Sequence, residues 1–121
     1  MAAKAFAIVA GAGSGTGASI ARRFAKSYPV ALLARNATSY ESLEKEINDS
    51  GGTAIGIPAD VTSESSIKKA LEKIEEQFGG ASCAAAIYQA SGGFTKSPFL
   101  EMKLGDLDQS WTITVYARRS W

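Results

Sequence analysis

Histidine is absent from the 121 residues of this chain. Catalytic groups of the Ser-His-Asp and Cys-His types need an imidazole as general base, and many metal sites use one as a ligand. The sequence therefore excludes both of these catalytic arrangements and every His-based metal site.

Cysteine is nearly absent as well. Cys83 is the only one, so the chain forms neither an internal disulfide nor a cysteine-cluster metal site. We expect no metal site, and a reducing compartment such as the cytoplasm is the simplest location. Because Cys83 opens a short apolar run, we expect it to be a small core residue.

An excess of charge and a long apolar run are also missing. The 13 Lys and Arg against 12 Asp and Glu leave a net charge of +1, which favours neither a nucleic-acid partner nor a charged membrane surface. No apolar run reaches the roughly 18 residues that a membrane span needs. A signal peptide at the N-terminus stays open as an alternative, because Lys4 precedes a short apolar stretch.

Short apolar runs alternate with amphipathic segments along the chain. Each run is too short for a helix and has Gly or Pro next to it or a few residues away, which predicts buried strands at 4–10, 30–34, 53–57 and 83–88. Helical spacing predicts helices at 16–27, from a cap at Ser39 to about 49, at 64–78 and from 104 to about 117. In helix 64–78 we expect burial of Ile67, Ala70, Leu71, Ile74 and Phe78. The alternation predicts an α/β fold: one Rossmann-like, doubly wound parallel sheet covered on both faces.

A glycine-rich turn joins the first predicted strand to the first helix. Gly11, Gly15 and Gly17 have the spacing G-x-x-x-G-x-G, and glycine lets a ligand phosphate approach the backbone closely. The helix N-terminus offers free N–H groups to that phosphate, and Ser14 and Thr16 add hydroxyls. The lysine of a phosphate-loop NTPase is absent. The pattern predicts a dinucleotide site, with a turn that serves only tight packing as the alternative.

Polar residues follow the second and third predicted strands. Arg35, with Asn36 beside it, comes where the adenosine ribose of a dinucleotide is expected. A guanidinium suits a 2′-phosphate, so NADP(H) is favoured and NAD(H) is the alternative. Asp60, followed by Val61, is placed to accept a hydrogen bond from the adenine amino group. The alternatives are a solvated loop charge for Arg35 and a helix cap for Asp60.

Together these residues resemble the short-chain dehydrogenase/reductase family. The family's turn T-G-x-x-x-G-x-G is similar to residues 10–17, its acidic-aliphatic pair to Asp60-Val61, and its N-N-A-G segment to residues 88–91. The resemblance covers residues 4 to about 115 and implies that Gln89 and Ala90 also line the cofactor site. It implies hydride transfer between a nicotinamide and a carbonyl or alcohol carbon. Ser14 stands where members that prefer NADP often carry a basic residue.

The catalytic group of that family does not occur in this sequence. The family uses a Ser and a Tyr with a Lys four residues later. The tyrosines here, Tyr28, Tyr40, Tyr88 and Tyr116, are followed at that distance by Leu32, Glu44, Gly92 and Ser120. We therefore assign no catalytic residue and expect the chain to be inactive alone. A non-catalytic module that binds a nucleotide or a partner, and a non-functional translation product, are the alternatives.

The expected organisation is a single NAD(P)-binding domain over residues 1–121, without the C-terminal half of the family fold. Truncation or an altered reading frame would explain that loss. The predicted strand order is 3-2-1-4, with the dinucleotide crevice between the first and fourth strands at their C-terminal ends. Strand 83–88 is then an uncovered edge that invites self-association. The expected partners are a dinucleotide and, only if the missing half is supplied, a small carbonyl or alcohol.

Overall fold

Strands and helices alternate through the part of the chain that the computed structural model describes. That part comprises residues 5–12, 15–90 and 98–113, without the side chains of residues 109 and 110. The strands are β1 (Ala5–Ala10), β2 (Val30–Ala34), β3 (Ala54–Pro58) and β4 (Ser82–Tyr88). The α-helices are α1 (Thr16–Ala25), α2 (Glu41–Asp49), α3 (Glu64–Gln77) and α4 (Leu104–Trp111), and two short 3-10 helices are η1 (Ala37–Ser39) and η2 (Phe99–Glu101).

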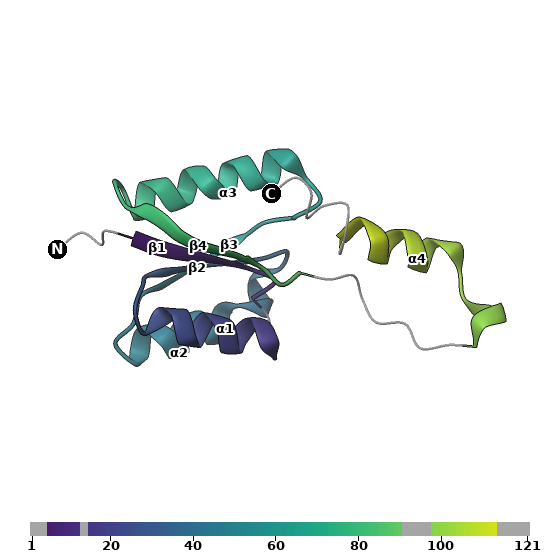
Figure 1. Cartoon of the computed structure of the whole chain (residues 1–121), viewed down its shortest axis with the longest axis horizontal. Helices are drawn as coiled ribbons and strands as arrows, with labels where there is room; N and C mark the ends of the chain where they lie inside the picture. Colours follow the sequence, from purple (N-terminus) through teal and green to yellow (C-terminus); the bar gives the residue numbers. More distant parts are fainter. Residues whose placement is uncertain (1–4, 13–14, 91–97, 114–121) are drawn as a thin grey trace.

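The strands form one parallel sheet in the order β3-β2-β1-β4. Helices α1 and α2 cover one face of the sheet and α3 covers the other (Figure 1). The predicted Rossmann-like fold and its strand order are therefore confirmed.

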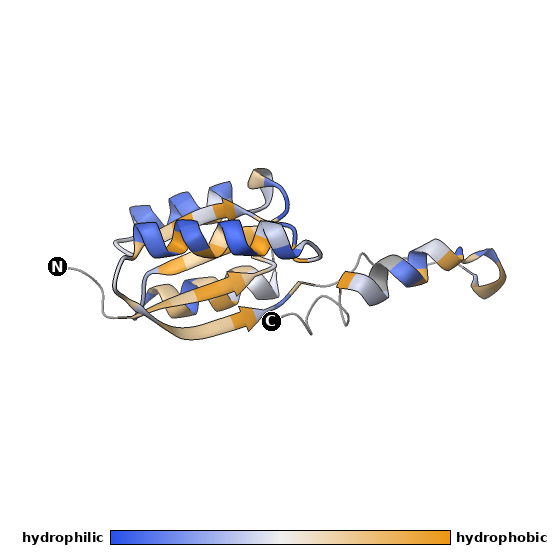
Figure 2. Ribbon diagram, turned by 90° about the horizontal axis from the view of Figure 1, so that it is seen from above, coloured by the Kyte–Doolittle hydropathy of each residue, from blue (hydrophilic) through white to orange (hydrophobic). Residues whose placement is uncertain are grey.

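The core consists of two apolar clusters, one on each face of the sheet. On the first face Val9, Leu32 and Val30 pack with residues of α1 and α2. On the second face Leu33 and Ile74 pack with residues of β1 and α3, and the ring of Phe6 lies 5.4 Å from that of Phe78. Figure 2 shows the apolar residues in the strands and the polar ones on the outer sides of the helices.

Two residues expected in the core are exposed. Leu71 of α3 is 47% exposed, because it projects beyond the face of the helix that carries Ala70 and Ile74 onto the sheet. Cys83 is exposed because β4 is an edge strand, and its first three residues are all exposed. Both burial predictions were wrong for the same reason. The spacing of apolar residues shows which residues could be buried, but it does not show how far the helices extend over the sheet.

The predicted cap at Ser39 is also wrong. Ser39 is the last residue of η1, where its N–H donates to the carbonyl of Asn36 at 3.0 Å. Helix α2 begins at Glu41 with Tyr40 as its N-cap, and no side chain of the described residues caps it. At this position the Tyr40 ring is buried and packs against Gly56 of β3.

Helix α4 lies apart from the sandwich formed by the sheet and α1–α3 (Figure 1). Its apolar residues Leu104, Leu107 and Trp111 are exposed, as are Phe99 and Leu100 of η2. The predicted continuation of this helix to residue 117 lies outside the described residues beyond position 113. Within the described part, no helix is both long and apolar enough to cross a membrane.

Candidate functional site

The glycine turn is held by close backbone packing. Gly17, in the first turn of α1, lies against the carbonyl of Gly11, and a Cβ added to Gly17 would be only 2.3 Å from that oxygen. The N–H of Gly11 donates to the Leu33 carbonyl at 2.9 Å, which ties the turn to β2. Any side chain at position 17 would separate the helix from the end of β1.

The turn also packs against the residues that follow β4. A Cβ on Gly11 would lie 2.5 Å from the backbone nitrogen of Ala90, and Gly11 has a φ of 88°. The N–H of Gln89 donates to the Ala10 carbonyl at 2.8 Å. The structure thus brings Gly11, Gln89 and Ala90 together at the carboxyl ends of β1 and β4, where the strand order reverses.

Gly15 differs from the other two motif glycines because its surroundings are open. It has a φ of 77°, is exposed, and a Cβ there would meet nothing within 4 Å. Gly15 is the N-cap of α1 and makes no side-chain capping bond. The first turn of α1 contains no acidic residue, so no carboxylate of that turn offsets the positive end of the helix dipole. The arrangement can accept an anion against the backbone N–H groups.

Arg35 and Asp60 lie at the carboxyl ends of β2 and β3. One carboxylate oxygen of Asp60, Oδ1, accepts from the Thr62 hydroxyl at 2.6 Å and from the Thr62 N–H at 2.9 Å. These bonds lower the pKa of Asp60, and the positive charge of Arg35 lowers it further. The cap of α3 is Ser63, whose hydroxyl accepts from the Ser66 N–H. Asp60 is therefore not the helix cap, and its other oxygen makes no hydrogen bond to a described residue.

An open hollow of about 500 Å³ lies beside Gly15, between α1 and the η1–α2 segment. It is lined by Gly15, Ala18, Arg22, Thr38, Ser39, Ser42, Leu43 and Glu46. Thr38, Ser39 and Ser42 were not among the predicted site residues, although the hydroxyl residues grouped after Arg35 and Asn36 were a signal for a site.

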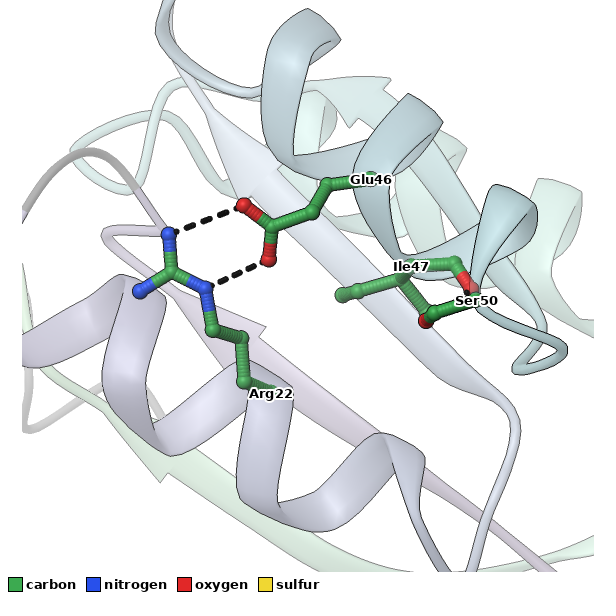
Figure 3. A network of polar contacts seen from close by, with 4 residues as sticks. All are labelled: Arg22, Glu46, Ile47 and Ser50. Atoms are coloured by element: carbon green, nitrogen blue, oxygen red, sulfur yellow. Dashed lines mark hydrogen bonds and ion pairs between the residues drawn. The ribbon is translucent and has the colours of Figure 1, made fainter.

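One wall of the hollow is an ion pair between α1 and α2 (Figure 3). The guanidinium of Arg22 binds the Glu46 carboxylate at both oxygens, with Nε–Oε2 2.6 Å and Nη2–Oε1 3.2 Å. The hydrogen bond from Arg22 lowers the pKa of Glu46, and Glu46 raises the pKa of Arg22. Both side chains are about half exposed, so the pair fixes the spacing of α1 and α2 more than it stabilises the fold.

The other predicted site residues that the structure describes each follow the carboxyl end of a strand. Thr16 begins α1 and is exposed, and Asn36 is exposed directly before η1. Val61 is half-buried against the cluster on the α3 face. The side chain of Gln89 is exposed. Ser14 lies outside the described residues. Among the described residues, no three His, Cys, Asp or Glu side chains gather into a group that could hold a metal ion.

The sequence matches the profile of the short chain dehydrogenase family over residues 5–117. The chain belongs to the short-chain dehydrogenase family. It is 34% identical, over 74 residues, to a short chain dehydrogenase of Pseudocercospora fijiensis. The matched residues make up 60% of this chain and 24% of the relative.

Solved structures of the family have the same fold. A metagenomic short-chain oxidoreductase in complex with NADP is similar with a TM-score of 0.82 and 26% identity, over 98% of this chain and 53% of the other. A dehydrogenase/reductase from Sinorhizobium meliloti is similar with a TM-score of 0.81 and 30% identity. The match covers 98% of this chain and 46% of the other chain. The chain therefore spans about half the length of these family structures, and its match covers about a quarter of the Pseudocercospora fijiensis relative.

Proposed function

We propose that the chain is a single NADP(H)-binding domain over residues 1–121, corresponding to the cofactor-binding half of a short-chain dehydrogenase. The carrying observation is the environment of the three motif glycines. Backbone atoms occupy the space that a side chain at Gly11 or Gly17 would need. Gly15 instead has open space around it, at the start of α1, where no side chain caps the helix. A dinucleotide pyrophosphate fits this arrangement, because Gly15 leaves it room and the helix offers N–H donors.

The adenosine end of the cofactor is assigned to the loops after β2 and β3. Arg35 and Asn36 would hold the 2′-phosphate, and Asp60 would accept from the adenine amino group through the oxygen that Thr62 leaves unused. Val61 would flank the adenine, while Ser14 and Thr16 would contact the pyrophosphate. Gln89 and Ala90, beside Gly11, would line the route toward the nicotinamide. The NADP complex of the metagenomic relative supports the choice of cofactor, and NAD(H) is the alternative.

The reaction of the whole family protein would be hydride transfer between the nicotinamide, which supplies this chemistry, and a carbonyl or alcohol. These 121 residues contain no Tyr with a Lys four positions later. We therefore propose that the chain alone has no turnover, and that a small substrate binds only when the other half of the fold is supplied. With a single cysteine and no disulfide partner, the cytoplasm is the proposed location.

A titration of the purified chain with NADPH and with NADH, followed by cofactor fluorescence or calorimetry, tests the proposal. We expect saturable binding that is tighter for NADPH, and Arg35→Gln should weaken NADPH binding while leaving NADH binding nearly unchanged. Lys26→Gln is the matched control, because Lys26 is an exposed cation at the other end of α1. A folded chain that binds neither cofactor would refute the function, and equal losses for both cofactors would refute the role of Arg35.

A second candidate function is a non-catalytic module that holds a partner. The observation favouring it is the exposed edge of β4, through which we propose that the chain self-associates.

A further inference from the structure

The two edges of the sheet differ, and the β3 edge is closed by side chains of α2. In β3 and its flanking residues, the odd-numbered positions direct their backbone N–H and carbonyl groups toward β2. The Thr53 carbonyl accepts from the Val30 N–H, and the Ala59 N–H donates to the Ala34 carbonyl, both at 2.9 Å. The even-numbered residues Ala54, Gly56 and Pro58 therefore direct their backbone groups outward.

Each of these outward positions is occupied or lacks a donor. The Asn48 amide donates to the Ala54 carbonyl at 3.0 Å and accepts from the Ala54 N–H at 2.9 Å, as a neighbouring strand would. The Glu44 carboxylate accepts from the Gly56 N–H. Pro58 has no N–H. An incoming strand would find no free N–H along β3, so this edge is closed to strand pairing.

The β4 edge has no such protection in the described structure. The Gln89 N–H points to β1, so alternation directs the backbone N–H and carbonyl of Ala86 away from the sheet. Neither group makes a hydrogen bond to a described residue. Ser82, Cys83, Ala84 and Ala86 are exposed, and the segment 82–87 contains no charged residue, proline or glycine. These are the features of a strand edge that is open to pairing.

We infer that a second copy of this chain pairs with β4, antiparallel and about a two-fold axis, to form a closed dimer. Pairing between the β4 edge of one copy and the β3 edge of another would build open chains, but Asn48 and Glu44 block β3. Only β4 with β4 remains, which is the symmetric, closed arrangement. An uncharged segment paired with itself meets no repulsion between like charges.

The shape of β4 sets the strength of the dimer. Its register against β1 shifts between Cys83 and Ala85, so Ala84 is an extra residue in β4. This irregularity shortens the regular part of the edge, and we expect a reversible dimer that forms as concentration rises. The inference concerns the sheet edge and does not depend on dinucleotide binding.

Sedimentation velocity of the full chain over a wide concentration range tests the inference. We expect a monomer–dimer equilibrium with no larger species. Ala86→Pro should shift it to monomer, because proline removes an outward N–H while the N–H groups that face β1 remain. Ala86→Lys, which places two like charges near the axis, should do the same, and circular dichroism confirms that each variant is folded.

Two further variants separate this dimer from other contacts. Asn48→Ala uncovers Ala54 on β3, so it should convert the dimer into larger assemblies. Leu107→Lys changes the exposed apolar face of α4 and should leave the dimer unchanged. A chain that is monomeric at all concentrations, that forms open-ended aggregates without substitution, or that is dissociated by Leu107→Lys but not by the folded Ala86 variants would overturn the inference.

Discussion

Gly17 lies directly against the carbonyl of Gly11, so the start of α1 and the end of β1 are in backbone contact. A Cβ at position 17 would be 2.3 Å from the Gly11 oxygen and 3.3 Å from the Cα of Ala12. The partner atoms belong to the backbone, so they cannot rotate away. The contact fixes the height of the helix N-terminus above the sheet, and with it the place where an anion can bind.

Gly17→Ala should therefore destabilise the fold. Forcing a methyl group into a packed backbone contact costs about 1–3 kcal/mol, which chemical denaturation of the purified chain would measure. Gly105→Ala is the control, because Gly105 lies in α4 and has nothing within 4 Å of its added Cβ. We expect that control to be at least as stable as the unsubstituted chain, because alanine favours a helix more than glycine does. Equal stability of the two variants would show that the turn relaxes and that the contact is not structural.

Gly15→Ala should separate cofactor binding from folding. Gly15 and Gly80 both have positive φ, 77° and 81°, and both have open space around an added Cβ. Alanine is strained at both sites because of the positive φ, and at Gly15, where ψ is −132°, the strain costs about 1–3 kcal/mol. Only Gly15 lies at the proposed pyrophosphate site, so Gly15→Ala should weaken NADPH binding at least tenfold while Gly80→Ala leaves it unchanged. The two variants would be compared by calorimetric titration and by thermal melting. Matching cofactor affinities would place the pyrophosphate elsewhere.

The bond from Thr62 to Asp60 should make stability depend on pH. It holds the pKa of Asp60 below its ordinary value. A carboxyl whose pKa is lowered by folding stabilises the native state above the unfolded pKa, and this contribution is lost as pH falls through the folded pKa. Thr62→Val removes the hydroxyl donor, so the pKa of Asp60 should rise and the variant should be less stable near neutral pH, with the difference closing in acid.

NMR titration of the Asp60 carboxyl carbon and denaturation at several pH values would measure these two effects. Thr53→Val is the control, because the exposed Thr53 side chain makes no hydrogen bond to a described residue. Its stability relative to the unsubstituted chain should not vary with pH. A constant difference for Thr62→Val across the same pH range would mean that the hydroxyl acts through packing instead.

The sequence allowed the sheet to be predicted because its strands are continuous apolar runs separated by glycine, proline and amphipathic segments. Strand 30–34 has the predicted bounds, β3 is shifted by one residue, and β4 begins one residue earlier than predicted. The first predicted strand ends at residue 10 as expected, and its first residue, Lys4, lies outside the described residues. Strands of a parallel sheet that is covered on both faces must be apolar at nearly every position, so their sequences are easy to tell from those of amphipathic helices. The position of the glycine turn followed from the same order of elements.

The predictions that were wrong, and the features that were not predicted, concern contacts between segments far apart in the chain. Cys83 is exposed because β4 lies at the edge of the sheet formed by the described strands, and α2 begins where Tyr40 packs against Gly56. The Arg22–Glu46 pair joins two helices through side chains whose spacing has no local period. The closed β3 edge was missed for the same reason, because Asn48 acts on a strand that only the fold brings beside it.

Gly56 and Tyr40 offer a direct test of one of these distant contacts. A Cβ on Gly56 would lie 2.0 Å from Cε1 of the Tyr40 ring, and the ring is buried between β3 and α2. Burial and the negative charge of Glu44 raise the pKa of Tyr40, which is consistent with its enclosed position. Gly56→Ala should therefore displace the ring and destabilise the fold by about 1–3 kcal/mol.

A double-mutant cycle shows whether that cost comes from the ring. Tyr40→Ala alone should destabilise the chain, because it leaves a cavity against β3. In the Tyr40→Ala background the added methyl group at position 56 has room, so Gly56→Ala should then cost clearly less than in the unsubstituted chain. Denaturant unfolding of the four proteins measures the coupling. Additive effects, within the few tenths of a kcal/mol typical of independent sites, would show that the two residues do not act on each other and that another contact determines where α2 begins.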